Sequence, residues 1–258
     1  MPKVGFLAPR KTLVAGAQTI RFAQSELPQN RPIAALHFDL TGGGNDLADI
    51  NRIRLKRNSK LHFDCTIAQL LALVSRYTRR TIATSATRLT IPCYRPSAAD
   101  AIDASEYDMG LRSGTLELEV EFASTTVAGD IGVAWTELES EPAAQPYFIS
   151  GSAATIVASK TNQRYIVDPP GVVAAITLPA PATKLSKVQA RFGGVLYADV
   201  SGVGLVESQA ILGSSDPDPL CFRLEPPSMG PVDLVLDTTA SWGASEEIAV
   251  YSALPVEV

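Results

Sequence analysis

The chain has 258 residues, of which 46% are hydrophobic and 19% charged, and its formal net charge is −5 at pH 7. This composition supplies a core and excludes a disordered chain or a coiled coil, which need far more charge. Two His and three Cys without metal-ligand spacing argue against a histidine-rich metal site and a disulfide framework, so we expect a reducing compartment. No apolar run approaches the ~20 residues of a membrane-spanning helix, and Pro9, Arg10 and Lys11 interrupt the apolar start, so we expect no signal peptide.

Charge is unevenly distributed along the chain. Residues 1–112 hold 16 Lys and Arg against 9 Asp and Glu, whereas residues 113–258 hold 6 against 18. If the two halves fold separately, they present surfaces of opposite charge. The split then predicts contact with an anionic partner, such as lipid or nucleic acid, or attraction between opposite ends of neighbouring copies. The alternative is drift between two domains, without functional consequence.

Most of the chain alternates apolar and polar residues with period two, as expected of strands that bury one face. The clearest case is Thr115–Phe122, in which Glu117, Glu119 and Glu121 separate four apolar residues. Similar runs occupy Ile33–Leu40, Ile131–Leu138, Val172–Leu178, Val188–Phe192, Val232–Leu236 and Ile248–Leu254. Eighteen Gly and eighteen Pro supply turns between them, so the pattern predicts an all-β sandwich or barrel.

One segment, Thr66–Arg80, has helical periodicity instead. Its apolar residues recur at i, i+3, i+4 and i+7, and Thr66 with Gln69 forms a capping-box pattern. Arg76, Arg79 and Arg80 lie where cations suit the helix dipole. The sequence therefore predicts one amphipathic helix inserted between strands of the first half.

The sequence contains an ordered internal repeat, which predicts two copies of one β domain. Residues 34–38 match 174–178 at an offset of 140, residues 50–70 match 185–205 at 135, and residues 115–122 match 247–254 at 132. Glu139–Gln145 has the composition of a linker, so we place the domains at 1–140 and 141–258. Glycines in Ser201–Val206 predict a shorter helix or a loop in the second copy.

Four groups of residues are candidates for a chemical role. Glu117, Glu119 and Glu121 share a strand face, as glycosidase carboxylates do, but a solvated face is the better interpretation. His37 and His62 each precede an Asp by two residues, yet a zinc site needs further ligands, and polar residues on wet strand faces are favoured. Gly42–Asn45 lacks the Lys-Ser/Thr of a phosphate-binding loop, so a β-loop is expected. The basic hairpin lacks interleaved aromatics and is interpreted as a contact with an acidic neighbouring subunit; its cations are Arg52, Arg54, Lys56, Arg57 and Lys60.

The tandem pattern resembles the double jelly-roll major capsid proteins of tailless icosahedral phages with an internal membrane, of the corticovirus type. The residues that carry the resemblance are the strand–turn–strand Ile53–Asp64 followed by helix Thr66–Tyr77, the glutamate strand Thr115–Phe122, and Pro169–Ile176 opening the second half. It implies two tandem eight-stranded jelly rolls, the first carrying an N-terminal arm and the inserted helix. It also implies a structural, non-enzymatic protein in the virion shell, built as pseudo-hexagonal homotrimers that contact neighbouring capsomers, vertex proteins and membrane-associated virion proteins.

The same resemblance implies roles for particular residues. It places the N-terminal segment inward, toward an internal membrane, where Lys3, Arg10, Lys11 and Arg21 would face lipid. Calcium is associated with stability in some members, and Asp216 and Asp218 offer oxygens, although an acidic turn is the simpler interpretation. The alternatives are a virion spike and a carbohydrate-binding or carbohydrate-cleaving sandwich, whose aromatic platform would draw on Trp135 and Trp242.

Overall fold

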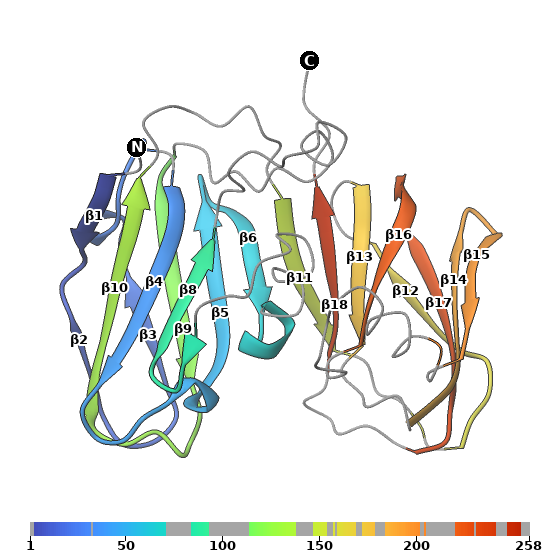
Figure 1. Cartoon of the computed structure of the whole chain (residues 1–258), viewed down its shortest axis with the longest axis horizontal. Helices are drawn as coiled ribbons and strands as arrows, with labels where there is room; N and C mark the ends of the chain where they lie inside the picture. The colour runs from blue at the N-terminus through green and yellow to red at the C-terminus, as the bar shows by residue number, and fades with distance from the viewer. Residues whose placement is uncertain are drawn as a thin grey trace. The chain divides into compact units, whose positions relative to one another are not determined.

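The computed structural model describes residues 3–31, 33–70, 84–92, 114–137, 147–153, 157, 159–168, 172–178, 184–201, 204, 220–229, 231–240 and 247–253. The chain forms two compact units. The first comprises residues 1–67 and 77–147, and the second comprises residues 68–76 and 148–258. Each unit is a sandwich of two antiparallel sheets (Figure 1). The predicted linker at 139–145, and with it the boundary at residue 140, lies outside the described residues.

The first sandwich pairs a sheet in the order β1-β10-β4-β8-β7, in which β2 also pairs with β10, with a sheet in the order β6-β5-β9-β3. We call them the β4 sheet and the β5 sheet. The strands of the β4 sheet are β1 (Lys3–Leu7), β2 (Lys11–Leu13), β4 (Ile33–Thr41), β7 (Thr84–Ser85), β8 (Arg88–Pro92) and β10 (Gly129–Glu137). Those of the β5 sheet are β3 (Gln18–Phe22), β5 (Ile50–Arg57), β6 (Lys60–Cys65) and β9 (Leu116–Phe122). Short 3-10 turns at Gln24–Glu26 (η1) and Leu47–Asp49 (η2) connect them.

The second sandwich repeats this plan with the orders β11-β18-β13-β16 and β12-β17-β14-β15. We call them the β13 sheet and the β14 sheet. Strands of the β13 sheet are β11 (Tyr147–Ala153), β13 (Val172–Leu178), β16 (Leu220–Met229) and β18 (Glu247–Ala253). Strands of the β14 sheet are β12 (Gln163–Val167), β14 (Leu185–Phe192), β15 (Val195–Val200) and β17 (Val232–Thr238).

In both sandwiches the successive strands alternate between the two sheets in the same order. The first strand and the last pair in one sheet, and the second strand and the seventh pair in the other, which is the connectivity of a jelly roll. Counting β1 and β2 as one interrupted strand and β7 as an edge extension, the described residues of each sandwich form eight strands. The prediction of two tandem eight-stranded jelly rolls is confirmed.

The two sandwiches share not only topology but also their irregularities. The register shifts at Ala34 in β4 and at Ala174 in β13, which are 140 residues apart. It also shifts at Asn51 in β5 and at Ser186 in β14, 135 residues apart. Since β-bulges are placed by local sequence and alter the twist, their coincidence at the two predicted offsets supports duplication of one domain.

The hairpins β5–β6 and β14–β15 match in the same way. Both turn through two residues of left-handed backbone, Asn58 and Ser59 in the first sandwich and Gly193 and Gly194 in the second. This is the conformation that a tight two-residue hairpin turn requires. Each hairpin then carries a bulge at the same place in its second strand, and these positions again differ by 135 residues.

The third block of the predicted repeat, which matched residues 115–122 to 247–254, is wrong. The topological counterpart of β9 is β17, at an offset of 116, because both lie next to the strand that begins the hairpin. The burial patterns of β9 and β17 are identical, with buried and half-buried residues alternating. β18 is instead the counterpart of β10. Amphipathic strands share composition, so sequence alone aligned the wrong pair.

The core follows the predicted alternation. In β9 the apolar residues Leu116, Leu118, Val120 and Phe122 are at most 1% exposed, and the glutamates between them are half-buried. The other predicted strand runs lie within β4, β10, β13, β14, β17 and β18, apart from Leu138 and Leu254, which fall outside the described residues. Burial of one face per strand therefore holds each pair of sheets together.

Residues 67–70 are helical, as predicted, and the remainder of the predicted helix lies outside the described residues. In the second sandwich Gly204 is helical, and its N–H donates to Ser201 Oγ at 2.9 Å. This hydrogen bond has the spacing of a helix N-cap, and Ser201 is the position that the repeat aligns with Thr66.

The loop Gly42–Asn45 is a structural β-loop. All three glycines have positive φ angles. A Cβ on Gly43 would collide with the carbonyl oxygen of Ala128. Asn45, 2% exposed, accepts from Val127 N–H at 2.9 Å and donates to the Val127 carbonyl at 2.8 Å. The glycines thus allow the loop after β4 to pack against the β9–β10 connection. A phosphate-binding loop would not require this contact.

We expect Gly43→Ala to lower the free energy of unfolding by about 2 kcal/mol or more, since it adds a backbone collision to an unfavourable φ. Gly44→Ala is the matched control, because its φ is +80° but nothing lies within 4 Å of its Cβ. It should cost about 1 kcal/mol from conformation alone. Denaturant unfolding of both variants measures the difference, and equal losses would contradict the packing argument.

Candidate functional site

The predicted basic hairpin and the glutamate strand are cross-strand neighbours in one sheet. β5 and β9 pair antiparallel, with Arg52 opposite Glu121, Arg54 opposite Glu119 and Lys56 opposite Glu117. On the other side of β9, Arg21 of β3 lies opposite Glu119. These side chains form a ladder of alternating charge on the outward face of the β5 sheet.

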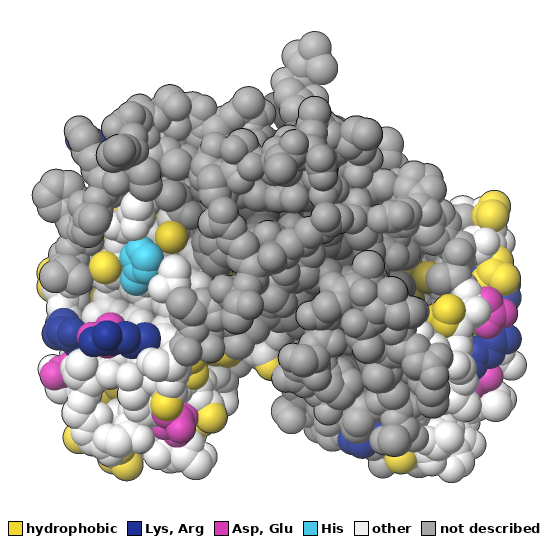
Figure 2. All heavy atoms as spheres, viewed as in Figure 1, with side chains coloured by type: hydrophobic (Ala, Val, Ile, Leu, Met, Phe, Trp, Pro, Cys, Tyr) yellow, Lys and Arg dark blue, Asp and Glu magenta, His cyan; other side chains and the backbone are white. Residues whose placement is uncertain are grey.

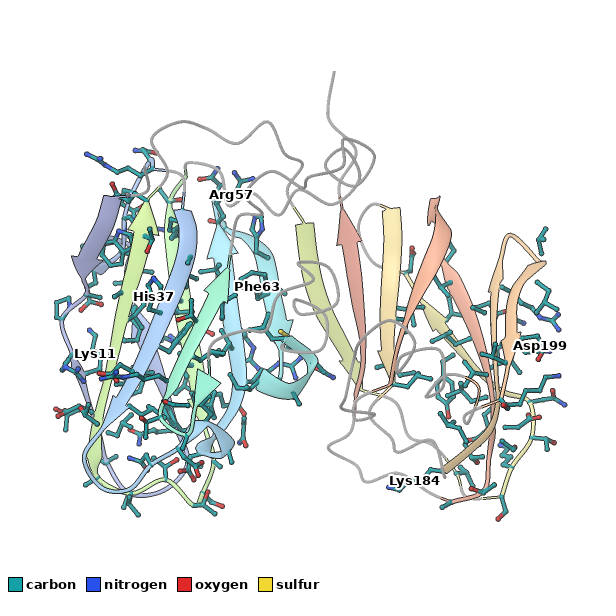
Figure 3. The ribbon with its side chains drawn as sticks, viewed as in Figure 1. Lys11, His37, Arg57, Phe63, Lys184 and Asp199 are labelled. Atoms are coloured by element: carbon teal, nitrogen blue, oxygen red, sulfur yellow. The ribbon has the colours of Figure 1, made fainter. Side chains whose placement is uncertain are left out.

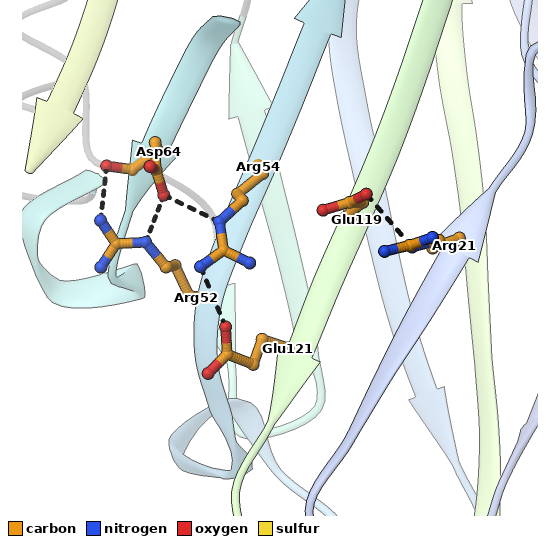
Figure 4. A network of polar contacts seen from close by, with 6 residues as sticks. All are labelled: Arg21, Arg52, Arg54, Asp64, Glu119 and Glu121. Atoms are coloured by element: carbon orange, nitrogen blue, oxygen red, sulfur yellow. Dashed lines mark hydrogen bonds and ion pairs between the residues drawn. The ribbon is translucent and has the colours of Figure 1, made fainter.

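Ion pairs join this ladder (Figure 4). Asp64 of β6 accepts from Arg52 Nε and, at 3.2 Å, from Arg54 Nε. Arg54 Nη2 lies 3.1 Å from Glu121 Oε2, and Arg21 Nε lies 3.2 Å from Glu119 Oε1. Acidic residues that pair with the basic hairpin therefore lie within the same chain, on β6 and β9.

This arrangement bears on the two hypotheses about these residues. Glu117 accepts from Gln24 Nε2 at 2.6 Å, and Glu119 and Glu121 face guanidinium groups, so the glutamates are half-buried and paired within the sheet face, which is more than the expected solvated face. A contact of the basic hairpin with another subunit stays a prediction. Arg57 donates from Nε to His62 Nε2 at 3.2 Å, and the side chain of Lys60 lies outside the described residues.

The charge gradient seen along the sequence does not separate the two sandwiches. The basic segment and the acidic strands β9 and β10 belong to the same sandwich. The first unit holds 15 Lys and Arg against 16 Asp and Glu, and the second holds 7 against 11. The expectation of two oppositely charged halves is therefore wrong, because antiparallel pairing brings the two charge signs together within one sandwich.

The four cations of the predicted inward-facing arm lie on strands β1 to β3 of the first sandwich, or beside them. Lys11 (Figure 3) pairs with Glu26, and its Nζ lies 5.7 Å from the Phe22 ring centroid. Arg10 pairs with Asp39 at 2.6 Å, and Arg21 pairs with Glu119. The side chain of Lys3 lies outside the described residues. The orientation of this surface toward a membrane stays a prediction.

A second charged cluster lies on the β4 sheet. Asp39 accepts from Arg10 and, at 2.9 Å, from Arg88 Nε. Burial opposes ionisation of Asp39, but hydrogen bonds from the two arginines outweigh it, so the pKa of Asp39 lies below its usual value. Arg88 is 74% exposed, so its charged group lies at the surface beside this aspartate.

His37 lies on β4 of the first sandwich and is half-buried (Figure 3). Its Nδ1 lies 3.0 Å from Thr90 Oγ1 and its Nε2 lies 2.9 Å from Thr136 Oγ1, so the ring bridges β8, β4 and β10. Burial lowers the pKa of His37, which favours the neutral ring. Hydroxyl groups satisfy both ring nitrogens, as expected of a polar strand residue and not of a metal ligand.

His62 lies in the other sheet and is 1% exposed, so the expectation that it lies on a wet face is wrong. The physical reason is the bulge in β6, where Leu55 pairs with Phe63 and Lys56 with Leu61. The extra residue between them is His62, which the bulge turns inward. Among the described residues, no group of three or more His, Cys, Asp or Glu is placed to hold a metal ion.

Two further sites considered from the sequence were a calcium site and an aromatic carbohydrate platform. Asp216, Asp218 and Trp242 lie outside the described residues. Trp135 is 5% exposed and donates from Nε1 to Glu137 at 3.3 Å, so it belongs to the core and does not form a carbohydrate platform. Cys65 is buried. Within the described part of the chain, no helix is both long and apolar enough to span a bilayer.

The β14 sheet reproduces the charge ladder in reduced form, which the sequence did not single out. Asp199 accepts from Gln189 Nε2 at 2.9 Å and lies 3.3 Å from Lys187 Nζ, as Asp64 does with Arg54 and Arg52. Arg164 of β12 pairs with Asp233 of β17 at 2.6 Å. The signal was present in the repeat, which aligned Asp64 with Asp199.

Comparison with known proteins agrees with this architecture. Residues 14–137 match the family model described as "Viral coat protein P2 N-terminal domain". The crystal structure of the major capsid protein P2 from bacteriophage PM2 is similar at a TM-score of 0.64 and 12% identity, covering 96% of this chain and 99% of that one. PBCV-1 VP54 and the PBCV-1 virus capsid cover 98% of this chain and 92% and 94% of theirs, at 9% and 10% identity and TM-scores of 0.49 and 0.47. No curated protein sequence matches the chain.

The chain is a double jelly-roll protein, and over 96% of its length it has the fold of the major capsid protein P2 of bacteriophage PM2. Its first sandwich matches the viral coat protein P2 type over residues 14–137. The resemblance drawn from strand pattern and loop placement is confirmed.

We expect Asp64→Asn to lower the free energy of unfolding by about 1–3 kcal/mol, because it leaves two arginines of a partly buried network without their shared carboxylate. Asp199→Asn is the matched control in the second sandwich, where the carboxylate and Lys187 are more exposed and the other partner, Gln189, is uncharged, so its effect should be much smaller. Denaturant unfolding of the two variants tests this. Equal losses would mean that the first network adds no special stability.

The lowered pKa of His37 predicts a pH dependence. Between the folded and the unfolded pKa the unfolded chain binds more protons, so stability should fall as the pH drops below ~6.5. His37→Gln keeps hydrogen-bonding groups near both threonines but does not titrate. The difference in unfolding free energy between wild type and H37Q, measured from pH ~7 to ~5, should therefore shrink toward acid. A difference that does not change with pH would contradict the assignment.

Proposed function

We propose that this double jelly-roll coat protein is a structural major capsid protein, three copies of which form a capsomer in the shell of an icosahedral virion. The observation that carries the proposal is the duplicated sandwich, with matching bulges and turns, in a chain that matches a major capsid protein over nearly its full length. The family match of the first sandwich supports the same role.

The duplication explains why a trimer suits this role. A cyclic trimer of a two-sandwich chain presents six similar sandwiches around one axis. Such a unit has nearly hexagonal symmetry and can contact six neighbours in a closed surface lattice. A single-sandwich chain would need six copies for the same outline, so duplication halves the number of contacts that must form.

The described surfaces favour a structural role over catalysis. Of the three glutamates on β9, Glu119 and Glu121 pair with arginines and Glu117 accepts from Gln24. The two histidines contact threonine hydroxyls and an arginine. The carbohydrate-binding alternative needs an exposed aromatic platform, and Trp135 is buried in the core. Localisation in a virion shell, with vertex and membrane-associated proteins as further partners, belongs to the same proposal.

Purified protein tests the proposal. Light scattering coupled to size-exclusion chromatography should give three times the 27.4 kDa chain mass, and electron microscopy should show flat particles of hexagonal outline. Concentration or a change of salt should drive them into sheets or shells. A strict monomer at every concentration and salt condition would contradict the proposal.

A further inference from the structure

The β5 and β14 sheets share one register, and their outward faces differ in chemistry. Gln189 and Val235 are opposite each other in the β14 sheet where Arg54 and Glu119 are opposite in the β5 sheet. A pair of opposite charges in the first sandwich is thus an amide and an aliphatic side chain in the second. Both sandwiches fold to the same plan, so outward positions that differ between them are free to serve separate roles.

β15, the end strand of the β14 sheet, exposes two consecutive apolar residues. Val195 is 68% exposed and Leu196 is 48% exposed. Neighbouring residues of a strand point to opposite faces, so both faces of this strand carry an exposed apolar side chain. Among the described strands, β15 pairs with β14 on one side and ends the sheet on the other. An apolar end strand of this kind is a surface on which another chain can bind.

The first sandwich shows that folding does not require this exposed valine. By the register of the two hairpins, Val195 corresponds to Lys60 and Leu196 corresponds to Leu61, which is half-buried. A lysine is therefore compatible with the fold at the position of Val195. Hydrophobic side chains lie beside acidic and basic ones over this part of the second sandwich (Figure 2). The apolar residues of β15 thus mark a surface that is available to a partner.

An anion accompanies the apolar residues of β15. Asp199 (Figure 3) is 40% exposed. The hydrogen bond from Gln189, with further help from Lys187, lowers the pKa of Asp199, so its carboxylate stays ionised. Along the sequence, residues 192–222 contain four acidic residues and no Lys or Arg. We call Val195, Leu196 and Asp199 the β15 surface.

The first sandwich has a side of opposite charge, formed by its strands β1, β2 and β3 (Figure 1). β1 and β2 lie at the end of the β4 sheet and β3 at the end of the β5 sheet, and Lys11 of β2 lies over the Phe22 ring of β3. Residues 1–25 contain four Lys and Arg and no Asp or Glu. Arg21 is 75% exposed and Arg10 is 47% exposed, whereas the carboxylates that pair with them are only 20% and 28% exposed. Cations are therefore outermost on this β1–β3 side.

We propose that the β15 surface of one copy lies against the β1–β3 side of the first sandwich of the next copy. The inference rests on the proposed function, in which three copies form a ring of six sandwiches. In that ring the second sandwich of each copy meets the first sandwich of the next, so both sandwiches of every copy take part in closing it. Contact between two different surfaces is heterologous, and a rotation that closes it generates a ring.

The positions of the two surfaces in the sandwich plan suit such a ring. β15 is the counterpart of β6, which lies at the opposite end of the β5 sheet from β3. Sandwiches joined through opposite sides continue from one to the next instead of closing as a pair. Charge also suits the contact, because Asp199 would meet Arg10 and Arg21. Exposed ion pairs within one chain contribute little, so these groups can pair between copies with little loss of stability.

Two double variants each remove one of the surfaces. V195K/D199N introduces the residue type that the first sandwich has at this place and removes the anion, so its own sheet should tolerate it. R10E/R21E reverses two cations of the β1–β3 side. Each variant should weaken self-association by about tenfold or more in sedimentation equilibrium. V127K is the matched control, since Val127 is 40% exposed in the connection between the interior strands β9 and β10, and it should associate as the wild type does.

A mixture of the two double variants tests whether the contact joins different surfaces. The R10E/R21E chain keeps its β15 surface and the V195K/D199N chain keeps its β1–β3 side, so one intact contact can form between them. The mixture should give a dimer of twice the 27.4 kDa chain mass and no trimer, under conditions in which neither variant associates alone. If two folded variants form no such dimer, the proposed contact is wrong.

The remaining outcomes separate this inference from the proposed function. A wild-type chain that is monomeric under all conditions contradicts the proposed function. A wild-type trimer together with an equally stable trimer of V195K/D199N overturns this inference alone. An R10E/R21E chain that still forms trimers but no longer binds vesicles of anionic lipid also overturns it, because the cations then face a membrane. Thermal unfolding confirms that the compared chains are folded, and R10Q/R21Q replaces the charge reversal if that variant is unfolded.

Discussion

Antiparallel register between β5 and β9 is the constraint from which the surface of the first sandwich follows. Side chains alternate between the two faces of a strand, so a slip of one residue would expose Leu118 and Val120 and bury the glutamates. Burial of one face thereby fixes the register, and the register sets each outward glutamate opposite a cation. The ion pairs are thus a consequence of packing in the core, and their partners could not be chosen independently of it.

The same constraint acts in the second sandwich. It keeps the buried positions, bulges and turns of the first sandwich, while the outward side chains differ. Bulges, tight turns and buried positions recur at fixed offsets, because each is needed to close a sandwich of this shape. Outward positions carry no such requirement. Arg54 and Glu119 could therefore give way to Gln189 and Val235 without loss of the fold. In a duplicated domain, conserved irregularities show what folding needs, and the differences between the faces show where the copies took on separate roles.

Sequence was sufficient to predict the strands with clear alternation, the double sandwich and two of the three repeat blocks. Alternation of apolar and polar residues, and the spacing between similar segments, can both be detected in the sequence itself. It missed β12, since exposed Ile166 breaks the alternation of that strand. It placed His62 on the wrong face, because a bulge leaves no mark in composition. It also separated the basic hairpin from the glutamate strand, which lie some sixty residues apart and meet only through long-range pairing.

The charge gradient shows why such long-range pairing decides function. Taken along the chain, it suggests that opposite halves attract between copies. In the folded chain part of that attraction is already satisfied inside the first sandwich, where Glu119 and Glu121 of β9 pair with arginines of β3 and β5. Recognition between copies must then come from surfaces that folding leaves unsatisfied. Exposed apolar side chains such as Ile166 and Leu196 of the β14 sheet are of this kind, because burying them against a partner would remove apolar surface from water.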